Sequence, residues 1–310
     1  MRVDYYRREK PLTLVSPSRG ERFWFSFIGY LLILRVYEKE QRPLPTPRND
    51  RTQNRKEANV LLMTANTEKD LTALKKVGEV VAEAREEMLA AVRPGITTAE
   101  LDAIAAKVLE KHGAKSAPKC QYKFPGYTCI SLNDVAAHGI PGKRAIKEGD
   151  LVNVDVSAEL NGYFGDTGAT IVVQPAQELK TKLCKCSHDA LYAAIDTVKD
   201  GAKINLIGKA IESQALSCGF KVIRNLTGHG IGHKLHEEPF NVLSFYRPND
   251  KSRMHEGLVI AIEGFISSGA EFVKEDADGW TLRTPDKSFV AQYEHTVVVT
   301  RGKPMILTAL

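Results

Sequence analysis

The sequence predicts an α+β fold in which two related helix-helix-strand units surround a largely antiparallel sheet. Three observations favour this fold. Two long segments space their apolar residues as amphipathic helices do. A glycine-bounded helical segment occurs twice, at 92–115 and at 198–221. The strand-like segments follow the helices in groups and include a hairpin turn, whereas a parallel sheet would alternate strands and helices one by one.

The N-terminal 62 residues differ from the rest of the chain in charge and in pattern. They carry 13 Lys and Arg against 7 Asp and Glu, while the remaining residues carry 30 against 31. Their apolar run at 22–34 is shorter than the roughly 20 residues of a membrane-spanning helix, and no small-residue cleavage site follows it. We therefore expect residues 1–62 to be an irregular basic and hydrophobic segment outside the native protein, which would begin at Met63. A membrane-associated tail is the alternative.

The composition of the body, residues 63–310, excludes several classes of protein. Its net charge near zero gives no electrostatic footprint for sequence-specific nucleic-acid binding. The five cysteines form an odd set without the spacing of a disulfide framework, and Cys184 with Cys186 is too little for a zinc site. Reduced thiols of this kind indicate a cytoplasmic protein.

The first unit contains two segments of helical pattern. Apolar residues from Leu71 onward follow the i, i+3, i+4, i+7 spacing, which predicts a helix over 68–91. The second segment begins where Thr97 or Thr98 can cap a helix, and it ends at Gly113.

The second unit repeats this pattern. In each copy Val, a basic residue, one further residue and Gly precede a helical segment that ends at a second Gly. The two glycines lie 18 positions apart in both copies, Gly95 to Gly113 and Gly201 to Gly219, and the helix before the second copy covers about 177–197. A duplication predicts a site between the halves, built from residues of both. The alternative is two unrelated helical hairpins.

Strand signals lie after each helical unit. Valines alternate with polar residues over 152–157, and Asn161 with Gly162 forms the favoured two-residue hairpin turn. Two later strands are expected at 257–265 and at 292–300.

The hairpin register places two carboxylates on one face of the sheet. With Asn161 and Gly162 at the turn, Asp155 lies opposite Gly168. Asp166 then lies opposite Ser157, so the two aspartates are diagonal neighbours at roughly 7–8 Å. Burying such a pair is costly unless a partner or a metal neutralises it. For these two residues alone, a solvated strand face is the favoured alternative.

Each of the later strands repeats this anomaly. Glu263 ends the apolar run of the first strand, and Glu294 interrupts the second beside His295. One glutamate in an apolar strand is consistent with a buried salt bridge. Four carboxylates together with the glycine-flanked His229 are hard to neutralise with nearby lysine or arginine side chains. A pair of divalent metals would neutralise them, and ligation by carboxylates with one imidazole suits Mn, Fe, Co or Zn.

Separated motifs carry a family resemblance. They are VNVDVS, GYFGDTGAT, TGHGIG, IAIEGF and QYEHTVVVT, preceded by YTCISLNDVAAHGIPG. With these motifs the chain resembles the type I methionine aminopeptidases over roughly residues 67–300. The resemblance implies the pita-bread fold, in which two pseudo-symmetric halves surround a dinuclear metal site, and it implies a catalytic domain at 63–310.

The resemblance also implies a set of five metal ligands, namely Asp155, Asp166, His229, Glu263 and Glu294. Asp166 and Glu294 would bridge both metals. Asp155 would complete the shell of one metal, and His229 with Glu263 that of the other. Two-metal sites of this kind activate water and polarise the scissile carbonyl, and Glu263 would carry the proton from this water to the leaving amine.

Other residues match positions that contact the substrate in the family. His138 would lie near the scissile bond, and His236 would hydrogen-bond the substrate carbonyl or amide and stabilise the tetrahedral intermediate. Four residues would form the methionine pocket, namely Phe124, Cys129, Leu235 and Trp280. Leu235 stands where an aromatic residue is common. Gly264 stands where the family usually has Pro, so we expect weaker preorganisation of Glu263.

The three histidines of the segment LTGHGIGHKLHEEP therefore have different expected roles. Glycines at 228, 230 and 232 disfavour the helix that would place His229 and His233 on one face. We expect His229 to bind metal, His236 to face the substrate and His233 to be structural.

The function implied by the resemblance is removal of the N-terminal methionine from nascent proteins and peptides, with preference for a small second residue. Its partners would be the N-terminal Met of nascent polypeptides and, transiently, the ribosome, and the enzyme would be a cytoplasmic monomer. Two alternatives remain. A pita-bread peptidase of the Xaa-Pro kind would carry a folded N-terminal domain, for which residues 1–62 are too short. A non-catalytic pita-bread protein that binds partners would have lost metal ligands.

Overall fold

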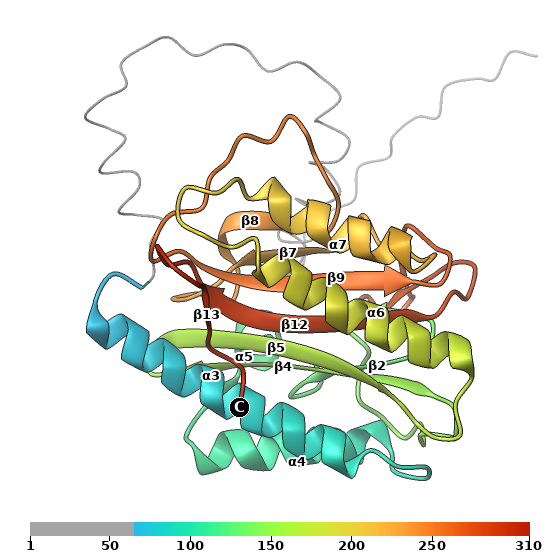
Figure 1. Cartoon of the computed structure of the whole chain (residues 1–310). Helices are drawn as coiled ribbons and strands as arrows, with labels where there is room; N and C mark the ends of the chain where they lie inside the picture. The colour runs from blue at the N-terminus through green and yellow to red at the C-terminus, as the bar shows by residue number, and fades with distance from the viewer. Residues whose placement is uncertain (1–64) are drawn as a thin grey trace, which may run out of the picture. The chain divides into compact units, whose positions relative to one another are not determined.

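A computed structural model describes residues 65–310 (Figure 1). The expectation that residues 1–62 lie outside the native protein therefore concerns residues that the structure does not describe. Among residues 65–310, no helix is both long and apolar enough to cross a membrane.

Two amphipathic helices form the first unit, as the sequence predicts. Helix α3 (Glu68–Ala91) and helix α4 (Thr98–Lys111) each begin with a capping box. In α4 the Thr97 hydroxyl accepts from the backbone N–H of Glu100, whose carboxylate accepts from the backbone N–H of Thr97. These reciprocal bonds satisfy donors that have no partner within the helix, so they fix where it begins.

The second unit contains helix α6 (Glu178–Ile195) and helix α7 (Asn205–Ser217). The four repeated glycines all have positive φ, namely 91° at Gly95, 68° at Gly113, 77° at Gly201 and 81° at Gly219. Glycine adopts this left-handed conformation without the steric cost of a Cβ. The repeated glycines of the sequence are therefore repeated turns of the backbone, as the predicted duplication requires.

Within residues 65–310 the central sheet has ten strands, and every pairing between them is antiparallel. Its main path runs β1-β4-β5-β12-β9-β7-β8. Three further strands pair with members of this path: β2 with β4, β6 with β9 and β13 with β12. The strands of this path are β1 (Lys115–Ser116), β4 (Leu151–Leu160), β5 (Tyr163–Val172), β12 (Val290–Val298), β9 (Val259–Ser267), β7 (Thr227–Gly230) and β8 (Glu237–Leu243). The side strands are β2 (Cys129–Leu132), β6 (Lys221–Val222) and β13 (Met305–Ile306). The predicted α+β class is confirmed.

The two halves are related strand by strand. In the first half the short strand β1 pairs with β4, and in the second half the short strand β6 pairs with β9. Strands β5 and β12 then pair with each other at the centre of the sheet. The pairing of β5 with β12 is thus the seam between the halves.

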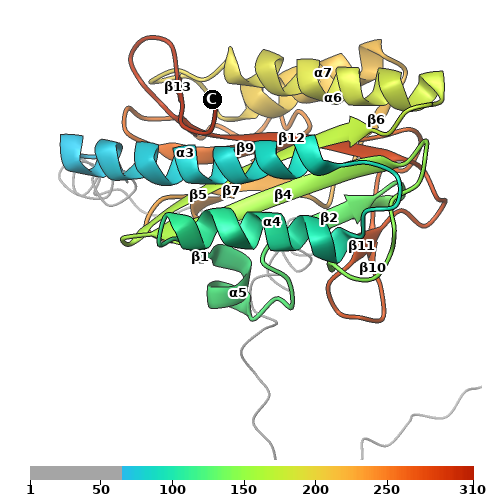
Figure 2. The same cartoon turned by 90° about the horizontal axis from the view of Figure 1, so that it is seen from below.

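The helices cover one face of the sheet, and smaller elements lie on the other. Figure 2 shows helix α5 (Ala117–Tyr122) and the strands β10 (Lys274–Glu275) and β11 (Leu282–Arg283) on the side of the sheet away from α6 and α7. Strands β10 and β11 form a second, three-stranded sheet with β3 (Val135–Ala137).

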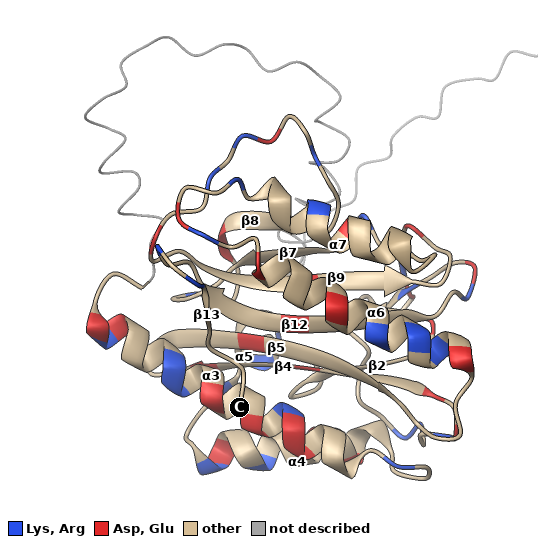
Figure 3. Cartoon of the chain, viewed as in Figure 1, with Lys and Arg blue, Asp and Glu red and all other residues tan. Residues whose placement is uncertain are grey.

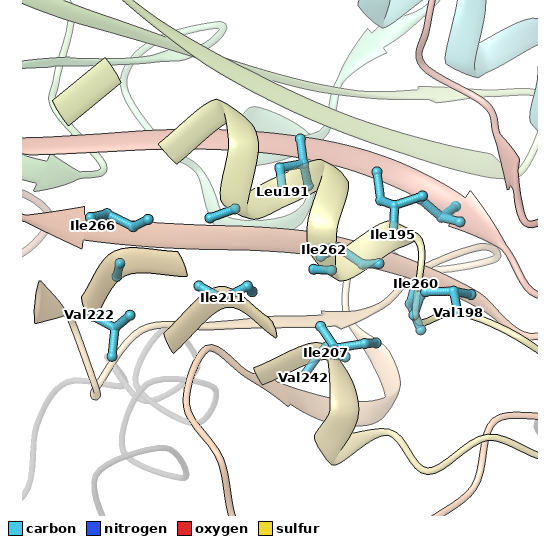
Figure 4. Close-up of a cluster of buried hydrophobic side chains, with 14 of the residues drawn as sticks. Leu191, Ile195, Val198, Ile207, Ile211, Val222, Val242, Ile260, Ile262 and Ile266 are labelled. Carbon is cyan, nitrogen blue, oxygen red and sulfur yellow. The ribbon is translucent and has the colours of Figure 1, made fainter. Parts of the chain in front are cut away.

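The core lies between the helices and the apolar face of the sheet. Figure 4 shows side chains of α6 and α7 against those of β9, among them Leu191, Ile195, Ile207, Ile211, Ile260 and Ile262. Burying one such side chain contributes about 1.5–3 kcal/mol. An equivalent cluster joins α3 and α4 to Val152, Val154 and Val156 of β4. Because side chains alternate along a strand, the odd-numbered residues of β4 and β9 point away from these helices.

The charged residues are spread over the helical surface. Figure 3 shows acidic and basic residues mixed along α3, α4 and α6. A mixed surface of this kind agrees with the near-neutral body found in the sequence.

Candidate metal centre and active site

The antiparallel register aligns three carboxylates in one row across the sheet. Asp155 on β4 pairs with Gly168 on β5. Gly168 pairs with Glu294 on β12, which pairs with Glu263 on β9. Side chains of one row share a face of the sheet, so all three carboxylates lie on the face opposite the helices. The register predicted for the hairpin, with Asp155 opposite Gly168, is confirmed.

Asp166 and His229 occupy the same face one step along their strands. Asp166 lies two residues before Gly168 on β5. His229 on β7 pairs with Ala261, which lies two residues before Glu263 on β9. The structure therefore brings together all five residues that the family resemblance implies as ligands.

The five side chains form a compact cluster. Single ligand atoms of Asp166, His229 and Glu294 all lie within 4.8 Å of one another. His229 Nε2 lies 3.9 Å from Asp166 Oδ2 and 3.8 Å from Glu263 Oε1. The Asp155 and Asp166 carboxyl groups lie close enough for each to change the pKa of the other. Five donors at these separations can converge on bound cations.

Among residues 65–310, no lysine or arginine balances the charge of the cluster. Burial raises the pKa of Asp155 to about 7. Burial, followed by the negative charge of neighbouring carboxylates, raises the pKa of Asp166, Glu263 and Glu294 well above their usual values. In the part of the chain that the structure describes, no lysine or arginine forms an ion pair with any of the four. Asp166 Oδ1 and Glu294 Oε1 are buried, and neither has a hydrogen-bond partner among the described residues.

His229 is present in the form that binds metals. Burial lowers its pKa to about 4, so the imidazole is neutral near neutral pH. Nδ1 lies 3.0 Å from the Gly230 carbonyl oxygen and can only donate there, which leaves the lone pair on Nε2 toward the carboxylates. Unpartnered carboxylate oxygens and a neutral imidazole nitrogen fit a divalent transition-metal ion.

Two buried amides, which the sequence reasoning missed, support the carboxylates. Gln292 Nε2 donates to Glu294 Oε2 at 2.9 Å, and the same side chain hydrogen-bonds Glu263. Gln292 Oε1 accepts from Asn153 Nδ2 at 2.7 Å. Gly168 leaves the room for this pair, because a Cβ there would lie 2.3 Å from Gln292 Oε1. Each amide lies two residues from a candidate ligand on the same strand face, and this is the signal that could have found them.

Replacing Gln292 with methionine is expected to weaken metal binding by about 10- to 100-fold, the usual cost of losing a group that orients metal ligands. Methionine keeps the length of the side chain but cannot donate to the two glutamates. Calorimetric titration of the metal-free protein with Mn measures the Kd. The same exchange at Gln214, on helix α7, should leave the Kd unchanged. A Kd in Gln292→Met equal to that of the parent would contradict this role.

Of the two histidines expected to contact substrate, His236 lies beside the cluster. The rings of His236 and His229 have their centroids 4.1 Å apart, and the Tyr122 hydroxyl lies 2.5 Å from His236 Nδ1. Although His236 also reaches solvent, burial of its ring, with His229 and His138 nearby, lowers its pKa well below the usual value. Burial lowers the pKa of His138 to about 4. Both imidazoles are therefore neutral near neutral pH.

Of the four residues expected to form the methionine pocket, Phe124 and Trp280 contact each other, while Cys129 and Leu235 lie next to site residues. Phe124 packs edge-on against Trp280, with ring centroids 5.2 Å apart. Cys129 on β2 pairs with Asp155, so it lies at the end of the carboxylate row. Leu235 is buried and precedes His236 in the chain. Apolar side chains thus lie close to the charged cluster.

His233 is separate from the cluster. Its side chain is exposed, its Nδ1 lies 3.4 Å from the Gly162 carbonyl oxygen, and its ring lies 4.7 Å from that of Tyr163. The segment Thr227–Gly230 is a strand and not a helix, as its glycines predict. The three histidines therefore have three different surroundings.

Gly264 follows Glu263 on β9 and faces helix α7. A Cβ at this position would lie 3.1 Å from Ile211 Cγ2, so a proline here would require Ile211 to shift slightly. Glycine thus allows α7 to approach β9 closely. Weaker preorganisation of Glu263 stays a prediction.

Comparison with known proteins identifies relatives of this chain. Residues 72–301 match the model of a family described as metallopeptidase family M24. The chain is 49% identical over 249 residues to methionine aminopeptidase 2 of Bacillus subtilis strain 168, a match that covers 80% of this chain and 100% of the relative. It is 50% identical over 249 residues to a methionine aminopeptidase of Staphylococcus epidermidis strain ATCC 12228, covering 80% and 99%. The crystal structure of methionine aminopeptidase from Rickettsia prowazekii superposes with a TM-score of 0.76 at 36% identity, covering 80% of this chain and 100% of that one.

Proposed function

Since the chain belongs to metallopeptidase family M24, among its type I methionine aminopeptidases, we propose that it removes the N-terminal methionine of nascent proteins at a dinuclear metal site built from the five clustered residues. Its activity is that of a methionyl aminopeptidase, and its fold is the pita-bread fold that the motifs imply. One observation carries the metal site. Two buried carboxylates, Asp166 and Glu294, and two half-buried ones, Asp155 and Glu263, lie beside the imidazole of His229. Among the described residues, Asp166 and Glu294 each keep a buried oxygen without a hydrogen-bond partner.

The proposed ligands divide between the two ions. Asp166 and Glu294 would contact both, Asp155 would contact one, and His229 with Glu263 would contact the other. When bound, two divalent ions would supply Lewis acidity, which lowers the pKa of a water molecule and polarises the scissile carbonyl. Glu263 suits proton transfer from the attacking water to the leaving amine, because burial and its neighbours raise the pKa of its carboxyl well above the usual value.

His138 and His236 would act on the substrate as neutral hydrogen-bond donors. A neutral imidazole can donate to the carbonyl oxygen of the scissile bond while negative charge develops on it. The ring of His236 lies against the ring of His229, so it is placed beside the proposed metal site. His138 would lie near the scissile bond.

The methionine side chain would bind among Phe124, Cys129, Leu235 and Trp280. An apolar pocket next to a cluster of carboxylates accepts an apolar side chain together with the free α-amine of the same residue. A small second residue would then pass beside the two histidines.

The catalytic domain is proposed to comprise residues 63–310, acting as a cytoplasmic monomer that contacts the ribosome transiently. The ions are proposed to be Co, Mn, Fe or Zn, because carboxylates with one imidazole suit these metals. The family assignment favours this function over a peptidase of the Xaa-Pro kind. Ligating side chains at all five positions favour it over a non-catalytic binding protein.

The test uses the full chain, freed of metal by a chelator and assayed on the peptide Met-Gly-Met. We expect release of free methionine after addition of at least one of Co, Mn, Fe or Zn. Release should be slower from Met-Trp-Met, and N-acetylated Met-Gly-Met should not be cleaved. If none of the four metals gives methionine release, the proposed function is wrong. If release is undiminished in the presence of the chelator, the proposed metal site is wrong.

A further inference from the structure

Tyr122 is the last residue of helix α5 and belongs to a segment held by its own hydrogen bonds. The Ser116 hydroxyl before the helix donates to the Tyr127 carbonyl oxygen at 2.6 Å. After the helix, the backbone N–H of Phe124 donates back to the first turn at 3.2 Å. These bonds close the segment on itself, so the direction of the Tyr122 side chain is set by the backbone around it.

The Tyr122 hydroxyl meets one particular nitrogen of His236. Its oxygen lies 2.5 Å from Nδ1, with the ring centroids 5.6 Å apart. A phenol hydroxyl ordinarily carries its proton at neutral pH, and at this distance its O–H can donate to the lone pair of Nδ1. A neutral phenol is the better donor of this pair and a neutral imidazole the better acceptor. The proton of this bond therefore belongs to the tyrosine.

We infer that Tyr122 is a positioning residue, whose O–H donates to His236 Nδ1 and thereby keeps the imidazole proton on Nε2. When Nδ1 of a neutral imidazole accepts a hydrogen bond, the single ring proton is on Nε2. Nε2–H is then the donor that His236 offers to the substrate carbonyl. The inference rests on the proposed function, in which His236 contacts the substrate.

The same segment also contributes to the methionine pocket. Phe124 lies two residues after Tyr122 and packs against Trp280 at 5.2 Å between ring centroids. One short segment therefore presents an apolar wall to the substrate side chain and a hydroxyl to the histidine that faces the scissile bond. Binding of methionine in the pocket and orientation of His236 depend on the same backbone.

The kinetic test compares Tyr122→Phe with the parent enzyme on Met-Gly-Met. We expect kcat to fall by about tenfold or more. One donor that stabilises the transition state raises kcat by about 10²–10³-fold, and a misdirected donor loses part of this increase. KM should stay within about twofold and metal content should be unchanged, because neither the pocket nor a ligand is altered. Tyr192→Phe is the matched control. It removes another contact between a tyrosine hydroxyl and an imidazole, 3.3 Å from His295 Nε2, and should leave kcat unchanged.

A double-mutant cycle separates this role from the role of His236 itself. If Tyr122 acts through His236, Tyr122→Phe should have no further effect in the His236→Ala background. Additive losses would overturn the inference, because Tyr122 would then act by another route. Full kcat in His236→Ala alone would instead overturn the proposed role of His236.

A spectroscopic test measures the tautomer directly and does not depend on activity. With ¹⁵N-labelled histidine, the zinc-loaded parent should show Nδ1 as the unprotonated nitrogen of His236 and Nε2 as the protonated one. Tyr122→Phe should show a mixture of the two tautomers, and Tyr192→Phe should match the parent. An unchanged His236 tautomer in Tyr122→Phe would overturn the inference whatever the kinetics show.

Discussion

Replacing His229 with alanine is expected to lower metal affinity by more than about 100-fold and kcat/KM on Met-Gly-Met by at least about 10³-fold. Losing a group that only supports a ligand already costs about 10- to 100-fold, and His229 is proposed to be a ligand itself. Its Nε2 lies 3.9 Å from Asp166 and 3.8 Å from Glu263, between side chains that would hold the ions. Without the imidazole, the set of proposed metal ligands would lose its neutral nitrogen ligand.

The measurement combines metal titration of the metal-free variant with assays at saturating metal. His233→Ala is the matched control, because His233 is an exposed histidine of the same segment whose side chain contacts Gly162 and Tyr163. We expect its Kd for metal and its activity to equal those of the parent. A His229→Ala variant that binds two equivalents of metal with parental affinity would refute the ligand role.

Replacing His236 with alanine is expected to lower kcat by about 10²- to 10³-fold while metal affinity stays at the parental level. Removing one donor that stabilises charge in a transition state costs about this much. The His236 ring lies 4.1 Å from the His229 ring, between the proposed metal site and solvent, where a substrate carbonyl would lie. The loss should therefore concern the reaction step and not the metal.

Three quantities decide this prediction: metal content, Kd for metal and kcat. Parental metal binding with a low kcat supports the substrate role. Loss of metal would make His236 a ligand, and a parental kcat would remove it from the reaction. His233→Ala again serves as the control for changing a histidine in this segment.

The positions of the first two carboxylates were predictable because one local feature sets them. The turn at Asn161 and Gly162 fixes the register of the hairpin, so counting along the strands places Asp155 and Asp166 on one face. The helices were predictable for a similar reason, since caps and helical periodicity are local. The single row that joins Asp155 to Glu294 and Glu263 needs the pairing of distant strands, and no turn in the sequence specifies that pairing.

The supporting residues could not be assigned from sequence because their roles exist only in tertiary contact. In the sequence, Gln292 and Asn153 are only polar residues within apolar strands. Their hydrogen bond forms because β4 and β12 both pair with β5 in the folded sheet. Tyr122 belongs to a six-residue helix, too short for a periodic pattern. Gly168 shows no positive φ, and its need to be glycine follows only from the Gln292 side chain beside it.

The seam between β5 and β12 determines when during synthesis and folding the enzyme can become active. Thr167 and Glu294, which are hydrogen-bonded across it, lie 127 positions apart in the chain. Contacts this distant in sequence form slowly, because the entropy of closing the loop is lost before the contact is gained. Metal ions that bind the folded site, and not the unfolded chain, then stabilise the folded state by mass action. An enzyme that processes the first residue of other polypeptides therefore becomes competent only after its own penultimate strand has left the ribosome and joined the sheet.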